Sequence, residues 1–240
     1  YINDLNIWPS FSYLSLNPNI NWEFIKKNKH LSWNYNYISR HIEWTIVNNN
    51  INFKWNWKSL TYNKNISFKI INKNFLLPWD ASILSIKPEI DFNFIIDNNH
   101  IDWNWVELSK HKNITLNIIL NNLNLPWNWD CVSLNPNLII QDIKKNIDKP
   151  WNWFYLSMTI KNISIKDLED NRLLFNYEAL SLNKNIHKLI KKIPYKPWNW
   201  TLLSETIDIN FIINYPNKNW NWDLVANNLT LRLKHIYYLN

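Results

Sequence analysis

The side chains that could carry chemistry are scattered along the sequence. The chain has six histidines, and no two of them stand at the HxxxH spacing of a zinc site. Acidic residues such as Glu23, Asp130 and Asp223 follow short polar residues, where a negative charge would complement the start of a helix. We therefore expect no metal site and no pair of catalytic carboxylates.

The composition excludes further kinds of reaction centre. The 240 residues include no Gly, and phosphate loops, dinucleotide fingerprints and nucleophile elbows all need it. The lone Cys131 excludes an internal disulfide and is typical of a reducing, intracellular compartment. We interpret Cys131 as a small structural residue beside Val132. The sequence predicts no enzyme and no cofactor.

Charge leaves nucleic-acid binding open as an alternative. The net charge is +7, and the most basic stretch holds Lys184, Lys188, Lys191, Lys192 and Lys196. The excess lysines do not form a continuous stripe, and arginine is scarce, which weakens the nucleic-acid reading. No apolar run reaches about 18 residues, so we expect no membrane span.

One motif recurs along the whole chain, most clearly as PWNWDCVSLN from Pro126 to Asn135. Its copies are centred on Ser15, Ser39, Thr61, Ser85, Ser109, Ser133, Ser157, Ser181, Ser204 and Ala226. They lie 22 to 24 residues apart, and a fixed period of this size is typical of stacked repeats that cover each other's apolar faces. We predict a single elongated domain, residues 1–240, of about ten repeats.

The first half of each repeat is predicted to be a short capped helix. Asn128 stands between Trp127 and Trp129, and an asparagine oxygen can accept a hydrogen bond from an unpaired N–H of the first helical turn. With Asn128 as the cap, Trp127 and Val132 become the pair that forms a hydrophobic staple. In the preceding copy the corresponding residues are Trp103, Asn104, Trp105 and Leu108.

The second half of the repeat follows the same pattern with smaller apolar residues, as from Ile66-Ser67 to Ile71 and from Ile114-Thr115 to Ile119. Asparagines such as Asn135 and Asn122 follow the two helices. Because the chain lacks Gly, we expect these asparagines to end the helices at positive φ. The predicted fold is all-α, an α-solenoid in which each repeat contributes two helices of roughly six to eight residues.

A β-structure is the alternative for the serine segment. Val132-Ser133-Leu134 imitates the strand of a leucine-rich repeat, which has a similar period. The residue after the serine position is Arg40 or Lys110 in other copies, so this position is not consistently buried. Together with the paired caps, this favours helices.

The connectors differ in length. Ile42 comes early in the second copy, without the Asn-Pro-Asn connector of the first, and the copy at 151–171 has one extra residue between Met158 and Asn162. The chain end, with Arg232 and Lys234, is expected to form a polar outer cap.

The recurring Trp-Asn-Trp-x-x-Leu-Ser and Ile-Thr/Ser/Asp-x-x-x-Ile motifs, as in Trp103 to Ser109 and Ile114 to Ile119, resemble a group of viral proteins. These are the tandem Trp- and Asn-rich repeat proteins of large DNA viruses with A+T-rich genomes. The resemblance covers nearly the whole chain. It implies a viral origin, an interaction or scaffold role, and a place in the viral factory or the virion; it supplies no catalytic residues.

Three functions follow as hypotheses. The first is a non-catalytic scaffold for protein partners. The second is a modular nucleic-acid binder, because the residues just after the caps vary, as in Asp130-Cys131, Phe154-Tyr155, Glu178-Ala179 and Thr201-Leu202. The third is a structural virion or filament component that associates end to end through exposed terminal repeats.

Overall fold

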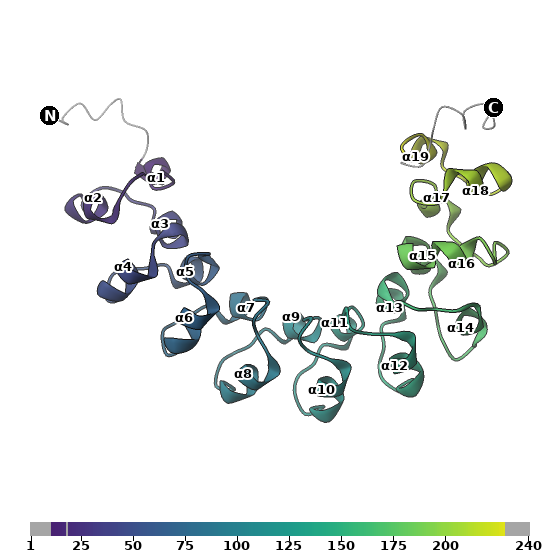
Figure 1. Ribbon diagram of the computed structural model, residues 1–240, viewed down its shortest axis with the longest axis horizontal. Coiled ribbons are helices and arrows are strands. Elements are labelled where there is room, and N and C mark those ends of the chain that lie inside the picture. The colour runs from purple at the N-terminus through teal and green to yellow at the C-terminus, as the bar shows by residue number, and fades with distance from the viewer. Residues whose placement is uncertain (1–10, 18, 229–240) are drawn as a thin grey trace. The chain divides into compact units, whose positions relative to one another are not determined.

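The computed structural model describes residues 11–17 and 19–228, and this part of the chain is helical (Figure 1). It contains nineteen short α-helices and no strand, and its one β pairing is an isolated bridge between Ile139 and Lys161. The all-α prediction is confirmed, and the β alternative for the serine segment is wrong. The expected polar cap at the chain end lies outside the described residues.

The chain divides into two compact units, residues 1–104 and 105–240, and each repeats one pattern. In the first unit, the first helices of the repeats are α1 (Phe11–Leu14), α3 (Tyr35–His41), α5 (Trp57–Tyr62) and α7 (Ala81–Leu84). The second helices are α2 (Trp22–Lys27), α4 (Trp44–Asn49), α6 (Phe68–Lys73) and α8 (Phe92–Asp97). Within this unit the two kinds of helix form two separate rows (Figure 1).

The second unit repeats the arrangement. Its first helices are α9 (Trp105–Ser109), α11 (Trp129–Val132), α13 (Trp153–Thr159), α15 (Tyr177–Leu182), α17 (Trp200–Leu203) and α19 (Trp222–Ala226). Its second helices are α10 (Leu116–Asn121), α12 (Ile140–Lys145), α14 (Ile165–Glu169), α16 (His187–Ile190, after the 3-10 turn η1 at Lys184–Ile186) and α18 (Ile209–Asn214). Several helices, such as α11 and α17, have only 4 residues, fewer than predicted.

The predicted caps begin most of the helices. The Asn128 side-chain oxygen accepts a hydrogen bond from the Cys131 backbone N–H at 2.9 Å. The same kind of bond is made by Asn34, Asn56, Asp80, Asn152, Asn176, Asn199 and Asn221 in first helices and by Asn21, Asp91, Thr115, Ser164 and Asp208 in second helices. Ser67 stands at the N-cap position of α6 as predicted, but its side chain makes no such bond.

Asn128→Ala is expected to lower the free energy of unfolding by about 1 kcal/mol, because a first-turn N–H loses its acceptor. Ser67→Ala is the matched control and should change stability much less, since Ser67 makes no side-chain cap bond. Urea denaturation followed by circular dichroism measures both. Equal losses in the two variants would contradict the capping role of Asn128.

In most repeats the residue before the cap is a buried tryptophan that packs against the preceding repeat. Trp127 is 8% exposed, and its ring meets that of Trp105 edge to face, with centroids 5.0 Å apart. Trp129 and Trp151 form the same contact at 5.2 Å. The two residues of the predicted staple, Trp127 and Val132, are both buried, as are Trp103 and Leu108 in the previous repeat. Edge-to-face rings are a favourable geometry for aromatic pairs.

The asparagines that follow the helices do not adopt positive φ, so that prediction is wrong. Asn122 has φ −136°. Within the described residues only Asn162 has a positive φ, 60°, in the connector that is lengthened by one residue. Asn122 instead donates from its side-chain amide to the Ile118 carbonyl at 2.8 Å, while its own carbonyl accepts the Trp127 indole N–H at 2.8 Å. Carbonyls at the helix end are thereby paired without a left-handed residue. Asn28, Asn50, Asn74, Asn98 and Asn146 make the same two bonds.

A second asparagine, after the first helix, ties its repeat to the previous one. Asn135 is 3% exposed, and its side-chain amide donates to the carbonyls of Ser109 at 3.0 Å and Ile114 at 2.8 Å. Its side-chain oxygen accepts the Asn137 backbone N–H at 3.0 Å. Asn135 therefore acts as a bridge between repeats. The equivalent residue Asn63 has an extended backbone, with φ −66° and ψ 121°. Asn63, Asn183 and Asn228 make equivalent bridges.

The repeat serine links each repeat to the cap of the next. The Ser133 hydroxyl donates to the Trp129 carbonyl at 2.8 Å and accepts the Asn152 backbone N–H at 2.9 Å. The same inter-repeat bond joins Ser15, Ser39, Thr61, Ser85, Ser109, Ser157, Ser181 and Ser204 to the cap residue of the following repeat. A small hydroxyl side chain at this position both fits a buried site and satisfies two backbone groups.

Ser133→Ala is expected to cost about 1 to 2 kcal/mol, because the Asn152 N–H loses its acceptor in a part-buried site. Ser133→Thr should retain most of the stability, since Thr61 makes both bonds in its own repeat. Chemical denaturation of the two variants tests this. If both variants lost the same stability, the hydroxyl would not be the group that matters.

Candidate interaction surface

The first half of every repeat displays two positions that vary from copy to copy. They lie three residues before and one residue after the repeat serine. In α3, α5, α13 and α15 both positions are helical and share one face, and in the other repeats the second position lies just after the helix. We call these positions the variable columns. The first column is Ser12, Asn36, Lys58, Ser82, Val106, Asp130, Phe154, Glu178, Thr201 and Asp223; the second is Leu16, Arg40, Tyr62, Ile86, Lys110, Leu134, Met158, Leu182, Glu205 and Asn227. All of these side chains are exposed or half-buried.

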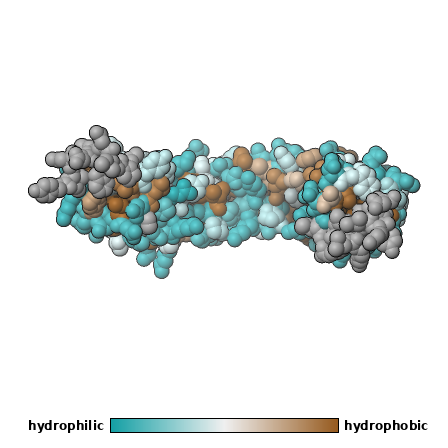
Figure 2. Space-filling model, turned by 90° about the horizontal axis from the view of Figure 1, so that it is seen from above, coloured by the Kyte–Doolittle hydropathy of each residue, from teal (hydrophilic) through white to brown (hydrophobic). Residues whose placement is uncertain are grey.

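Large apolar side chains are exposed within the variable columns. In the first unit Tyr62 is 44% exposed and Ile86 is 45% exposed, and in the second unit Phe154 is 42% and Leu182 is 44% exposed. The face drawn in Figure 2 likewise shows hydrophobic patches interrupting a mostly hydrophilic surface. Exposed hydrophobic patches are typical of protein interaction sites.

The two units differ in the charge of the variable columns. In the first unit the charged members are Arg40 and Lys58, and none is acidic. In the second unit Asp130, Glu178, Glu205 and Asp223 stand against one basic residue, Lys110. Lys110 itself pairs with Glu107 at 2.9 Å. The charged members of the variable columns are therefore basic in the first unit and mostly acidic in the second.

In the pairs of variable residues that follow the caps, only the first residue of each pair is exposed. Asp130 and Glu178 are exposed, but Ala179 is fully buried and Cys131 is half-buried within its helix. Burial raises the pKa of the Cys131 thiol, so the reactive thiolate is disfavoured at neutral pH. The position after the serine, which forms the second variable column, was recognised from the sequence as not consistently buried, but it was not predicted to belong to an interaction surface.

The five clustered lysines lie around η1 and α16, on the row of second helices. Lys184, Lys188, Lys191 and Lys192 are exposed, and Lys196 is half-buried. One of these charges is paired, since the Lys191 ammonium lies 2.7 Å from an Asp208 carboxylate oxygen. Burial, together with the nearby charges of Lys184 and Lys191, lowers the pKa of His187.

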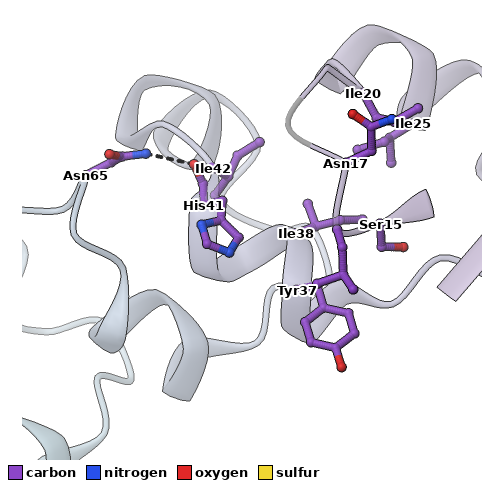
Figure 3. A pocket seen from close by; sticks show the side chains of 10 residues that line it. Ser15, Asn17, Ile20, Ile25, Tyr37, Ile38, His41, Ile42 and Asn65 are labelled. Carbon is purple, nitrogen blue, oxygen red and sulfur yellow. Dashed lines mark hydrogen bonds between the residues drawn. The ribbon is translucent and has the colours of Figure 1, made fainter. Parts of the chain in front are cut away.

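A cavity of about 470 Å³ lies within the first unit, beside α2 and α3 (Figure 3). Its walls include the aliphatic side chains of Ile20, Ile25, Ile38 and Ile42. His41 lies at its edge (Figure 3). His41 occupies the position of the bridging asparagines such as Asn63. The sequence shows that His41 replaces the asparagine and that the connector after it is short. That a bridge between repeats is missing there could be seen only from the structure.

No group of three or more His, Cys, Asp or Glu side chains among the described residues could hold a metal ion. None of the helices in the described part of the chain is long and apolar enough to cross a membrane.

Comparison with protein-family models, curated proteins and solved structures gives no match for the chain.

Proposed function

We propose that the chain is a non-catalytic α-solenoid scaffold that presents a long surface to protein partners. This proposal rests on one observation: the buried residues of the repeat stay constant, while exposed positions vary. Buried residues such as Trp127, Ser133 and Asn135 recur from repeat to repeat, whereas the variable columns change chemistry at nearly every copy. A stack of this design can match a partner residue by residue along its length.

The resemblance to viral Trp- and Asn-rich repeat proteins supports a role of this kind inside an infected cell. In this proposal the partners are viral or host proteins met in the viral factory or the virion. The exposed aromatic and aliphatic members of the variable columns would supply the buried centre of each contact, and the charged members would select the partner.

Capture of partners from infected cells tests the scaffold proposal. A column variant, Tyr62→Ser with Phe154→Ser and Leu182→Ser, should lose captured proteins without a fall in melting temperature, because the replaced side chains are 44%, 42% and 44% exposed. Leu76→Ser with Leu174→Ser is the matched control, since these apolar residues are 97% and 64% exposed but lie outside the columns. Capture of the same proteins by wild type and column variant would refute the proposal.

A second candidate, nucleic-acid binding, is favoured by the exposed lysines near η1 and α16. A gel-shift titration at two salt concentrations separates it from the scaffold role. Tight binding that weakens steeply with salt, and that is lost in Lys188→Glu with Lys192→Glu, would favour this candidate. Sedimentation at rising concentration tests the third hypothesis, end-to-end association into a filament.

A further inference from the structure

The cavity in the first unit exists where the repeat frame lacks its asparagine bridge. In the following repeat, the side chain of Asn63 extends back and donates to the carbonyls of Ser39 at 3.0 Å and Ile42 at 2.7 Å. One repeat earlier the equivalent residue is His41, which is exposed and lines the cavity. The Asn65 side-chain amide donates to the His41 carbonyl at 2.8 Å and holds this edge of the cavity (Figure 3).

The cavity is suited to an apolar side chain. Ile25 and Ile38 are buried and Ile20 and Ile42 are half-buried, and they give the cavity an aliphatic wall, while Ser15, Asn17, His41 and Asn65 line the rest. Tyr37 is 38% exposed, also lines the cavity and is next in sequence to Asn36 of the first variable column. A partly apolar pocket that includes an aromatic side chain suits the partner residue that contributes most to binding.

The part of the first unit that contains the cavity is basic, and this charge indicates which residues of a partner would lie beside its apolar side chain. Residues 11–65 include seven Lys or Arg and only two Glu. Arg40 follows the buried Ile38 on α3 and is exposed in a variable column, with its guanidinium 5.4 Å from the centre of the Tyr62 ring. A partner with carboxylates on both sides of an apolar residue would complement this surface.

We propose that the cavity is an anchor site for an acidic peptide segment of a protein partner, with one aromatic or long aliphatic side chain in the cavity and carboxylates near Arg40. This inference rests on the scaffold function proposed above and names the partner chemistry. A single-stranded nucleic acid is disfavoured here, because its bases stack on exposed aromatic faces and not between isoleucines.

The probe is a fluorescein-labelled synthetic peptide in which phenylalanine is flanked on each side by glutamates. Fluorescence anisotropy measures its binding to the full chain. We expect binding that weakens at least about tenfold when the peptide phenylalanine becomes alanine, and by a similar factor in Arg40→Glu. Lys69→Glu is the matched control, because Lys69 is exposed on α6 in the row of second helices, and it should change the affinity much less.

His41→Asn is the decisive variant. It supplies the side chain that bridges the repeats at Asn63, so its amide should occupy part of the cavity, retain or raise the melting temperature, and weaken peptide binding at least about tenfold. His41→Trp, which places a larger side chain at the edge of the cavity, serves if the first variant does not fold.

Three results would overturn the inference: no peptide binding by the wild-type chain, equal binding by wild type and a folded cavity-filling variant, or equal binding of a peptide with lysines in place of glutamates. Displacement of the peptide by oligodeoxythymidine at low concentration would assign the site to nucleic acid instead. If His41→Asn has no effect while the column variant still loses partners, the anchor site fails and the scaffold function stands. If the column variant keeps every partner, the scaffold function itself fails.

Discussion

Trp127→Ala is expected to lower the free energy of unfolding by about 3 to 5 kcal/mol, the largest effect of any single substitution considered for this chain. The indole is 8% exposed and its ring packs on Trp105 at 5.0 Å. Its N–H also donates to the Asn122 carbonyl at 2.8 Å. Alanine removes the packing, opens a cavity between two repeats and leaves that carbonyl without the indole.

Trp127→Phe separates the two contributions. It keeps an aromatic ring but loses the N–H, so its loss should be smaller, as Phe175 already holds this position and contacts Trp153 at 5.6 Å. Trp222→Ala is the control, since Trp222 is 50% exposed. Urea denaturation gives all three values. A Trp127→Ala loss no larger than that of Trp222→Ala would mean that the tryptophan contacts do not hold the repeats together.

Asn135→Leu is expected to cost about 3 kcal/mol or more, because several buried backbone groups lose their partner at once. The side chain of Asn135 bonds to Ser109, Ile114 and Asn137, with donor–acceptor distances of 3.0, 2.8 and 3.0 Å. Leucine has a similar size and is well tolerated in apolar cores, so any large loss reports on the hydrogen bonds.

Asn137→Ala is the matched control for the bridge. Asn137 is exposed, although its side-chain amide donates to the Lys112 carbonyl at 2.7 Å. An exposed hydrogen bond of this kind is expected to contribute about 1 kcal/mol or less. Thermal melts compare the two variants. Similar melting temperatures for both would show that the buried bridge has no special role.

The parts of this fold that depend on local chemistry were predictable. The capping role of Asn128 needs only an oxygen and an N–H three residues away, and the staple needs only two apolar residues at fixed spacing. The helix starts and the burial of Trp127 and Val132 were therefore predicted. Ser67 was the exception, because a residue of the right type need not turn its hydroxyl toward the first turn.

The parts that depend on contacts between repeats were not predictable from local rules. Asn135 was expected at positive φ because asparagine is the usual substitute for Gly at a helix end. Its actual partner Ser109 lies 26 residues earlier in the chain. The serine at the centre of each copy was recognised by its spacing, but its bond to the next cap was not. The anchor cavity was not predictable either, because the presence of His41 has a meaning only once the bridge made by Asn63 is known.

Amide hydrogen exchange of the cap asparagines tests most directly the claim that one hydrogen-bonded frame joins successive repeats. The backbone N–H groups of Asn152 and Asn176 are bonded at 2.9 Å to the hydroxyls of Ser133 and Ser157 in the preceding repeats. Both should exchange much more slowly than in an unstructured peptide, and Ser133→Ala should accelerate Asn152 while leaving Asn176 protected. Rapid exchange at both asparagines in the wild-type chain would contradict the frame and the stacked repeats built on it.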